Sequence, residues 1–385
     1  MVAMRWVGSV GDRPSEEYIA DLRARGRNLL RDARDKYAIA RFLAADAFFP
    51  FWIQGTRDPS PEELALADED AERARKMAIE LGDADLESMA LDALGGTSQA
   101  KSDWAAARDA AYQRIKFESS LGFYERLDAH SMAAWMSYCL GDLAATDRVS
   151  ADMAARLLPG QAPYPALHLF SWRALALNML GRWDEAVNVF WRVVEAWHDA
   201  GKHAAGYALR GFSVGLDIGR ARGDARLAGT AAEAMQSILA RFAAGHFYRA
   251  YDPYARGEPG LTDSDSLGPA EAPAECIERR ISLASDRREM LSEQLLERGL
   301  ARANRSRFPL LEAQVLRARA LARNDAADMS AAIAMWERMG AQPQLGRARA
   351  ECGLIAGDAA ETEAGLAMLK KLGDVNYVDR FAARV

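Results

Sequence analysis

The sequence has 385 residues, of which 50% are hydrophobic and 27% are charged, and its formal net charge is −6 at pH 7. This composition is typical of a well-packed globular protein, and the negative charge argues against a general nucleic-acid-binding surface. No run approaches the roughly 20 apolar residues that span a bilayer, and residues 1–11 lack the apolar core of a secretory signal. Cys139, Cys276 and Cys352 are too few and too far apart for a disulfide framework. We therefore expect a cytoplasmic protein without membrane contact.

The N-terminal part of the sequence predicts helices separated by short turns. Residues 1–13 show no periodicity and are expected to be loose. A Pro-Ser-Glu-Glu stretch at residues 14–17 marks the start of a helix, and a second helix is expected over residues 34–52. Residues 55–61 form a turn by composition, which ends in a serine that caps the next helix and a proline in its first turn.

After residue 61, glycines recur along the sequence at regular intervals. The series that follows the second helix of each predicted pair consists of Gly82, Gly122, Gly160 and Gly201. The series that lies at the turn inside each pair consists of Gly141, Gly181 and Gly223. Both series repeat about every 40 residues, which is typical of helical repeat arrays. Glycine suits these positions because it enters the left-handed backbone conformation at a helix end without steric cost. The spacing predicts helical repeats over residues 14–242.

The clearest helical hairpin lies between Leu167 and Ala200 and turns at Gly181. Its second helix carries one wide apolar stripe, formed by Trp183, Ala186, Val187, Phe190, Trp191, Val194 and Trp197. The hairpin resembles a tetratricopeptide repeat (TPR) in its alternation of bulky and small residues at Phe170, Ala174, Gly181, Trp183, Ala186 and Phe190. The resemblance implies an all-α solenoid, a TPR-like superhelix of about eight antiparallel helix pairs.

Residues 243–275 interrupt the pattern with prolines, glycines and a cluster of aromatic residues, and we expect an insert loop with little helix or core. TPR-like repeats resume over residues 276–385 and end in a capping helix. These C-terminal repeats resemble the sensor regions of bacterial signalling regulators, including ATPase-type transcription activators and adenylate cyclases. That resemblance implies a partner-binding or sensing module in signal transduction and nothing catalytic.

Motifs that could support chemistry are weak. Residues 211–215 read Gly-Phe-Ser-Val-Gly, which matches the nucleophile elbow of hydrolases, but the preceding residues predict a helix where an elbow needs a strand. Residues 263–274 begin like a calcium loop but end in Ala274, where a bidentate glutamate is required. The histidines do not form a zinc-ligand pattern, and no phosphate-binding loop is present. The sequence therefore predicts no catalytic residue, metal or cofactor.

In TPR proteins the first helix of each pair lines a concave groove. Aligned on the turn glycines, the resemblance implies groove positions that include Asp128, Ser131, Trp135, Tyr138, His168, Asn178, Arg210 and Asp217. Such a mixture of aromatic, polar and basic side chains suits a peptide or a small ligand. An equally good interpretation is that these residues only contact the neighbouring helix pair.

The sequence favours a non-catalytic scaffold that binds a protein or peptide partner in the concave groove. The first alternative is a small-molecule-sensing module that acts on a separate effector protein. A third hypothesis, an enzyme on an α/α scaffold, requires convergent acid–base or metal-binding groups, and none stands out. Association into homo-oligomers through a terminal helix pair also remains open.

Overall fold

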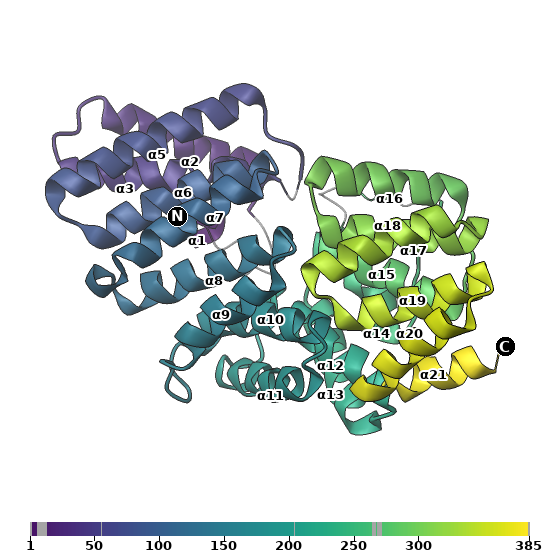
Figure 1. Cartoon of the computed structure of the whole chain (residues 1–385). Helices are drawn as coiled ribbons and strands as arrows, with labels where there is room; N and C mark the ends of the chain where they lie inside the picture. Colours follow the sequence, from purple (N-terminus) through teal and green to yellow (C-terminus); the bar gives the residue numbers. More distant parts are fainter. Residues whose placement is uncertain are drawn as a thin grey trace. The chain divides into compact units, whose positions relative to one another are not determined.

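A computed structural model describes residues 2–5, 14–54, 56–203, 205–263, 267 and 272–383. Within these ranges the secondary structure consists of helices joined by turns and contains no strand (Figure 1). None of the described helices is both long enough and apolar enough to cross a bilayer. The chain divides into two compact units, residues 1–136 and 137–385, and each unit is described separately. This division does not coincide with the boundaries predicted at residues 242 and 276.

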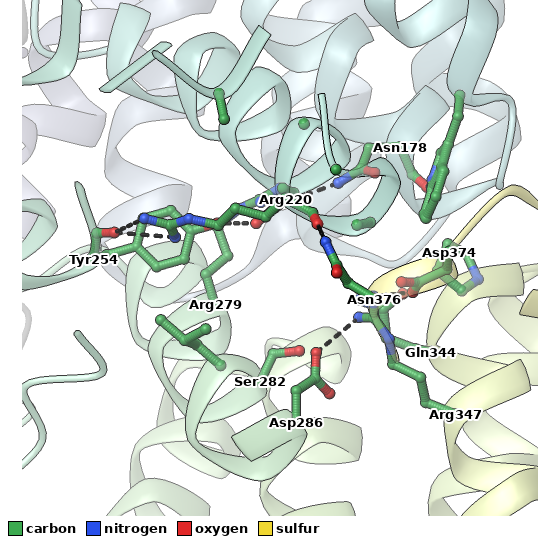
Figure 2. Close-up of a pocket in the computed structure, with 18 of the residues that line it drawn as sticks. Asn178, Arg220, Tyr254, Arg279, Ser282, Asp286, Gln344, Arg347, Asp374 and Asn376 are labelled. Carbon is green, nitrogen blue, oxygen red and sulfur yellow. Dashed lines mark hydrogen bonds and ion pairs between the residues drawn. The ribbon is translucent and has the colours of Figure 1, made fainter. Parts of the chain in front are cut away.

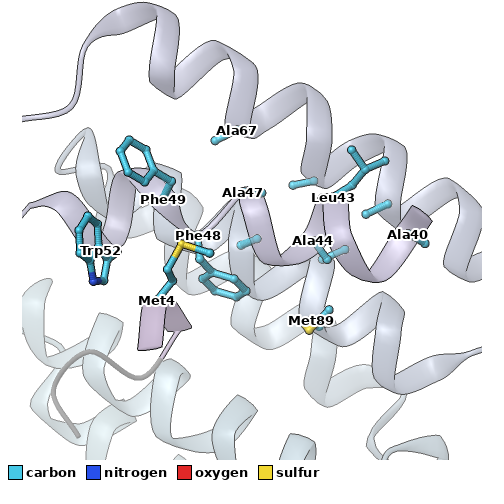
Figure 3. Close-up of a cluster of buried hydrophobic side chains, with 14 of the residues drawn as sticks. Met4, Ala40, Leu43, Ala44, Ala47, Phe48, Phe49, Trp52, Ala67 and Met89 are labelled. Atoms are coloured by element: carbon cyan, nitrogen blue, oxygen red, sulfur yellow. The ribbon is translucent and has the colours of Figure 1, made fainter. Parts of the chain in front are cut away.

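The first unit packs its helices in sequential pairs. It contains α1 (Val2–Arg5), α2 (Glu16–Leu30), α3 (Lys36–Asp46), α4 (Phe49–Ile53), α5 (Pro61–Leu81), α6 (Ala84–Ala100), α7 (Trp104–Lys116), the 3₁₀ turn η2 (Glu118–Ser120) and most of α8 (Phe123–Cys139). Local chemistry fixes the helix ends: Ser60 and Glu63 form a capping box at the start of α5, and Gly82 ends that helix with φ +66°. The core of this unit gathers side chains from α3, α4, α5 and α6, including Leu43, Phe48, Trp52 and Met89 (Figure 3).

The expectation that residues 1–13 are loose is wrong for their first part. Val2–Arg5 forms the short helix α1, Met4 joins the core in Figure 3, and Arg5 is buried. Arg5 donates to Asp92 at 2.8 Å and to Glu125 at 2.5 Å, so long-range ion pairs hold a segment that has no periodicity of its own. Residues 6–13 lie outside the described part of the chain.

The second unit is a longer series of helical hairpins. It begins at the end of α8 and contains α9 (Leu143–Ala154), α10 (Pro163–Met179), α11 (Trp183–Asp199), α12 (Ala208–Arg222), α13 (Ala225–Leu239), η3 (Phe247–Ala250), α14 (Tyr251–Arg256), α15 (Ala274–Arg287), α16 (Glu293–Ser306), α17 (Pro309–Arg323), α18 (Ala326–Met339), α19 (Gln342–Ala356), α20 (Ala359–Leu372) and α21 (Val375–Ala382). The pairs α10–α11, α12–α13, α17–α18 and α19–α20 pack as antiparallel hairpins. The predicted fold class is confirmed within the described ranges: the protein is all-α and is built from successive antiparallel helix pairs.

Close packing between paired helices explains the small residues of these hairpins. Ala186 is fully buried between helices, and a Cβ added at Gly215 would lie 2.3 Å from the Phe190 ring. Ser213, the candidate nucleophile of the Gly-Phe-Ser-Val-Gly stretch, is buried in the middle of α12 and donates to the carbonyl oxygen of Arg210 at 2.7 Å. The glycines of this stretch therefore serve helix packing rather than a nucleophile elbow.

The expectation that residues 243–275 contribute little helix or core is also wrong. They include η3 and α14, and Tyr248, Tyr251 and Tyr254 are all buried in the second unit. Prolines and glycines prevent one long helix here, but tyrosines three residues apart still place three rings on one face. Residues 264–266 and 268–271 lie outside the described part of the chain.

The C-terminal helices of the second unit return to its first hairpins. Helix α19 contacts α10, and α21, yellow in Figure 1, contacts α12. The backbone takes part in this contact, because Arg222 Nε donates to the carbonyl oxygen of Leu372 at 3.4 Å and the Asn376 amide donates to that of Arg220. This return encloses a cavity between the early and late repeats of the unit.

A polar cavity as the candidate functional site

The predicted groove residues of the first unit have partners within that unit. Asp128 accepts from Arg114 at 2.6 Å and from Arg5 at 3.0 Å. Ser131 is buried and donates to the backbone carbonyl of Leu127 at 2.9 Å. Trp135 is half-buried and its ring meets Phe51 edge-on, with centroids 6.2 Å apart. These contacts correspond to the second interpretation of the sequence, in which the positions pack against neighbouring helices.

In the second unit, Tyr138 and His168 belong to an aromatic cluster. Tyr138 is 1% exposed and packs against Trp172 and Phe308, with ring centroids 5.3 Å and 6.2 Å away. His168 Nε2 accepts from Trp172 Nε1 at 2.9 Å, and its ring lies 5.2 Å from that of Tyr207. Burial raises the pKa of the Tyr138 hydroxyl, which keeps it neutral at physiological pH. Tyr138 is therefore a core residue and not an exposed groove anchor.

Arg210 also lies inside the unit, with 5% of its surface exposed. Its Nε donates to Glu275 Oε1 at 2.5 Å, and its guanidinium carbon lies 4.5 Å from the centroid of the Trp172 ring. Glu275 is in the first turn of α15, so the chain's own helix contacts the position where the sequence predicts a partner. Arg210 is consequently wrong as an exposed anchor, because α15 covers it.

Asn178 and Asp217, the remaining two predicted residues, line a cavity of about 460 Å³ in the second unit. Six helices contribute most of its polar lining: α10, α12, α14, α15, α19 and α21. The lining holds five arginines and five acidic residues, namely Arg220, Arg279, Arg287, Arg347 and Arg380, and Asp217, Asp224, Glu278, Asp286 and Asp374. Figure 2 shows the labelled polar side chains converging from these helices. Two of the predicted groove positions therefore line this cavity, together with residues of α15.

Asp217 of α12 accepts hydrogen bonds from several side chains of the cavity lining. Its carboxylate accepts from the Asn178 amide at 3.3 Å, from the Tyr254 hydroxyl and from Nη1 of Arg279. These three donors come from α10, α14 and α15, so one side chain of α12 ties three other helices together. Hydrogen bonds in which one partner is charged are stronger than those between neutral groups. The bond from Arg279 to Asp217 therefore helps to hold α15 beside α12.

Asp286 of α15 lies at the centre of a second group of ion pairs in the cavity lining. It accepts from Arg317 at 2.7 Å and pairs with Arg347 at 3.3 Å, and Arg347 also pairs with Asp374 at 2.7 Å (Figure 2). Burial alone would raise the pKa of Asp286, but the two arginines outweigh it and lower that pKa below its usual value. Asp286 is therefore ionised and already neutralised by the protein.

Glu278 differs from Asp217 and Asp286. It lies on α15 two turns before Asp286, is 2% exposed and lines the cavity, yet no group in the described part of the chain donates to its Oε1 atom. Burial raises the pKa of Glu278 to about 8, and the nearby carboxylates of Asp217 and Asp286 contribute to the increase. Glu278 is thus a buried carboxyl group that holds a proton near neutral pH and whose Oε1 atom lacks a partner among the described residues.

Other polar atoms of the lining are also without partners among the described residues. They are Oε1 of Gln344, Nε and Nη2 of Arg279, and Nε of Arg347. A buried donor or acceptor without a partner costs about 1–3 kcal/mol, so their concentration around one cavity favours a ligand that supplies both kinds of group. No group of three or more histidine, cysteine or carboxylate side chains suited to a metal occurs within the described ranges.

The sequence interpretation missed Glu278, Gln344 and Arg347 because it looked for groove residues only in the repeats before residue 242. One signal was present in the sequence: Glu278, Ser282 and Asp286 recur every four residues on one face of α15. A polar stripe at that spacing on an otherwise buried helix is typical of a lined cavity.

Neither a protein-family model nor a curated protein matches this sequence. One similar solved structure is the crystal structure of Rap protein complexed with competence and sporulation factor, with 10% identity, a TM-score of 0.45, and coverage of 96% of this chain and 100% of that chain. Another is a circular tandem repeat protein with novel repeat topology, with 16% identity, a TM-score of 0.25, and coverage of 96% and 91%. These similarities are too distant to assign a function to this chain.

Proposed function

We propose that this protein is a non-catalytic binding module and that the cavity of its second unit holds a short, polar segment of a peptide or protein partner. The observation that carries the proposal is the set of buried polar atoms around the cavity that lack partners among the described residues, including Glu278 Oε1, Gln344 Oε1 and Arg279 Nε. A peptide backbone offers both N–H donors and C=O acceptors in a small volume. It therefore matches a lining in which both acceptors and donors are unsatisfied.

The dimensions of the cavity limit the size of the bound segment. Its volume of about 460 Å³ lies within the range of roughly 300–1,000 Å³ that is usual for ligand pockets. Because Glu275 of α15 pairs with Arg210, a long helix or strand of a partner has no room at that position. A few residues of a partner chain fit this volume.

The same volume supports the second candidate, a module that senses a small molecule for a separate effector. The balance of five arginines and five carboxylates in the lining favours a ligand with both charges over a purely anionic one. Both candidates place binding in this cavity, and they differ in whether the ligand is a chain segment or a free small molecule.

Direct binding tests the proposal. The full chain is incubated with a mixture of tetrapeptides randomised at every position, and bound species are identified by native mass spectrometry. Ser282 lines the cavity, so Ser282→Phe should fill it and weaken retention of the bound species by about tenfold or more. Ser330→Phe is the matched control, because Ser330 is exposed on α18. Equal retention by both variants, or no retained peptide with the unchanged chain, would contradict the proposal.

A further inference from the structure

The carboxyl group of Glu278 is chemically distinct from the other acids of the cavity. Asp217 has donors from three helices, and Asp286 is paired with two arginines. Glu278 shares one face of α15 with Asp286, lines the same cavity as Asp217 of α12, and has no donor at Oε1 within the described residues. Among the described residues Glu278 forms no ion pair, and at 2% exposed it is one of the most deeply buried acids of the lining.

We propose that Glu278 binds a primary ammonium group of the ligand, either the free N-terminus of a peptide or a small amine. The proposal rests on the proposed function, because it names the chemical group that enters the same cavity. An ammonium group carries three N–H donors and one positive charge. It would satisfy Oε1 of Glu278 and balance the carboxylate, while a neutral amide would supply the hydrogen bond without the charge.

The surrounding charges favour a cation next to Glu278. The largest charge contributions to the pKa of Glu278 come from Asp217 of α12 and Asp286 of α15, which raise it, and from Arg347 of α19 and Arg317 of α17, which lower it. Both arginines are committed to ion pairs, Arg347 with Asp286 and Asp374, and Arg317 with Asp286 and Glu351. Adding one positive charge beside Glu278 therefore compensates a carboxylate that the arginines do not contact.

Binding should release a proton near neutral pH. Burial raises the pKa of Glu278 to about 8, so at pH 7 the empty site holds a neutral carboxylic acid. When the ammonium group enters, the carboxylic acid loses its proton to solvent, and the resulting carboxylate forms an ion pair with the ammonium. The proton is the only species released, and no bond to carbon or nitrogen changes.

The experiment compares ligand mixtures that differ in one group. The full chain is incubated with randomised tetrapeptides that carry a free N-terminus, with the same mixture acetylated at the N-terminus, and with lysine and putrescine as small amines. Native mass spectrometry measures the retained species. We expect retention from the free mixture or from the amines, and about tenfold less from the acetylated mixture, because acetylation removes the charge.

A pair of variants assigns the effect to one residue. Glu278→Gln keeps the shape and removes the charge, so it should lower retention of the ammonium ligands by about tenfold. Glu363→Gln is the control, because Glu363 is exposed on α20 outside the cavity, and it should leave retention unchanged. Melting curves of both variants show whether they fold like the unchanged chain.

The outcomes separate this inference from the proposed function. Equal retention of free and acetylated peptides would overturn the ammonium site and leave peptide binding in place. Retention of lysine or putrescine without any peptide would support the ammonium site and contradict a peptide ligand. Undiminished retention by Glu278→Gln would overturn the role of Glu278, and no retention from any mixture would overturn both proposals.

Discussion

Arg210 of α12 and Glu275 of α15 form a buried ion pair, with Nε and Oε1 2.5 Å apart. These residues are 65 positions apart in the sequence, and the pair joins a repeat from before the proline-rich segment to the helix that follows it. The guanidinium also lies over the Trp172 ring. Through this contact, α15 covers the predicted groove position at Arg210.

Arg210→Ala should destabilise the protein by about 3–5 kcal/mol, because it leaves the Glu275 carboxylate buried without its counter-charge. Urea unfolding measures the change. Arg305→Ala serves as the control, since Arg305 is exposed on α16 and surface changes usually stay within about 0.5 kcal/mol. An unchanged unfolding midpoint for Arg210→Ala would show that Arg210 faces solvent, as the sequence first suggests.

Tyr251 tests whether residues 247–256 belong to the core. The side chain is 0% exposed, and its hydroxyl has no partner among the described residues. Tyr251→Ala should cost about 3–5 kcal/mol through the cavity it creates, whereas Tyr251→Phe should be neutral or stabilising because it removes an unsatisfied hydroxyl. Thermal unfolding compares the two variants. A small effect of Tyr251→Ala would mean that this segment is a loose insert.

Glu278 should make stability depend on pH. Its pKa is about 8 in the folded chain and 4.5 for a free side chain, so between these values the folded state holds a proton that the unfolded state has lost. Stability should therefore fall as pH rises from about 4.5 to 8, by up to about 1.4 kcal/mol per pH unit from this group.

Denaturant unfolding of the unchanged chain and of Glu278→Gln at several pH values measures this contribution. The variant should lose the part of the decline that comes from Glu278, because glutamine does not titrate, while Asp217, whose pKa burial raises to about 7, still contributes. Asp217, Asp286, Arg347 and Arg317 act on Glu278 and are retained in both chains, so the difference between the two curves reports Glu278 together with its effect on these neighbours. Parallel curves would contradict a buried, protonated Glu278.

Ala186 tests the phase of the predicted hairpin. It is fully buried between α10 and α11, so Ala186→Leu should overpack the contact and cost about 1–3 kcal/mol. Asn188 is exposed on the same helix, and Asn188→Leu should change the unfolding free energy little. If urea unfolding shows the same loss of unfolding free energy for both substitutions, the face of α11 predicted to point inward is wrong.

The sequence alone was enough to predict the repeated helix pairs and the glycine turns between them. Ser60 caps α5, and Gly181 and Gly223 turn their hairpins with φ of +73° and +70°, as the pattern predicts. Gly82 ends α5 in the same conformation. These features depend on residues within a few positions of one another, because helix caps, glycine turns and the 3.6-residue apolar period are local properties of the backbone.

Only the tertiary structure decided which groove residues remain open and which are buried. Asn178 and Asp217 line the cavity, while α15 covers Arg210, and the choice depends on contacts such as Arg210–Glu275 and Asp217–Arg279 between distant parts of the chain. The same holds for Arg5, which is ordered by carboxylates 87 or more residues away. The local spacing of residues does not predict such pairings. Each one depends on which of many possible long-range contacts are compatible with a single packed structure.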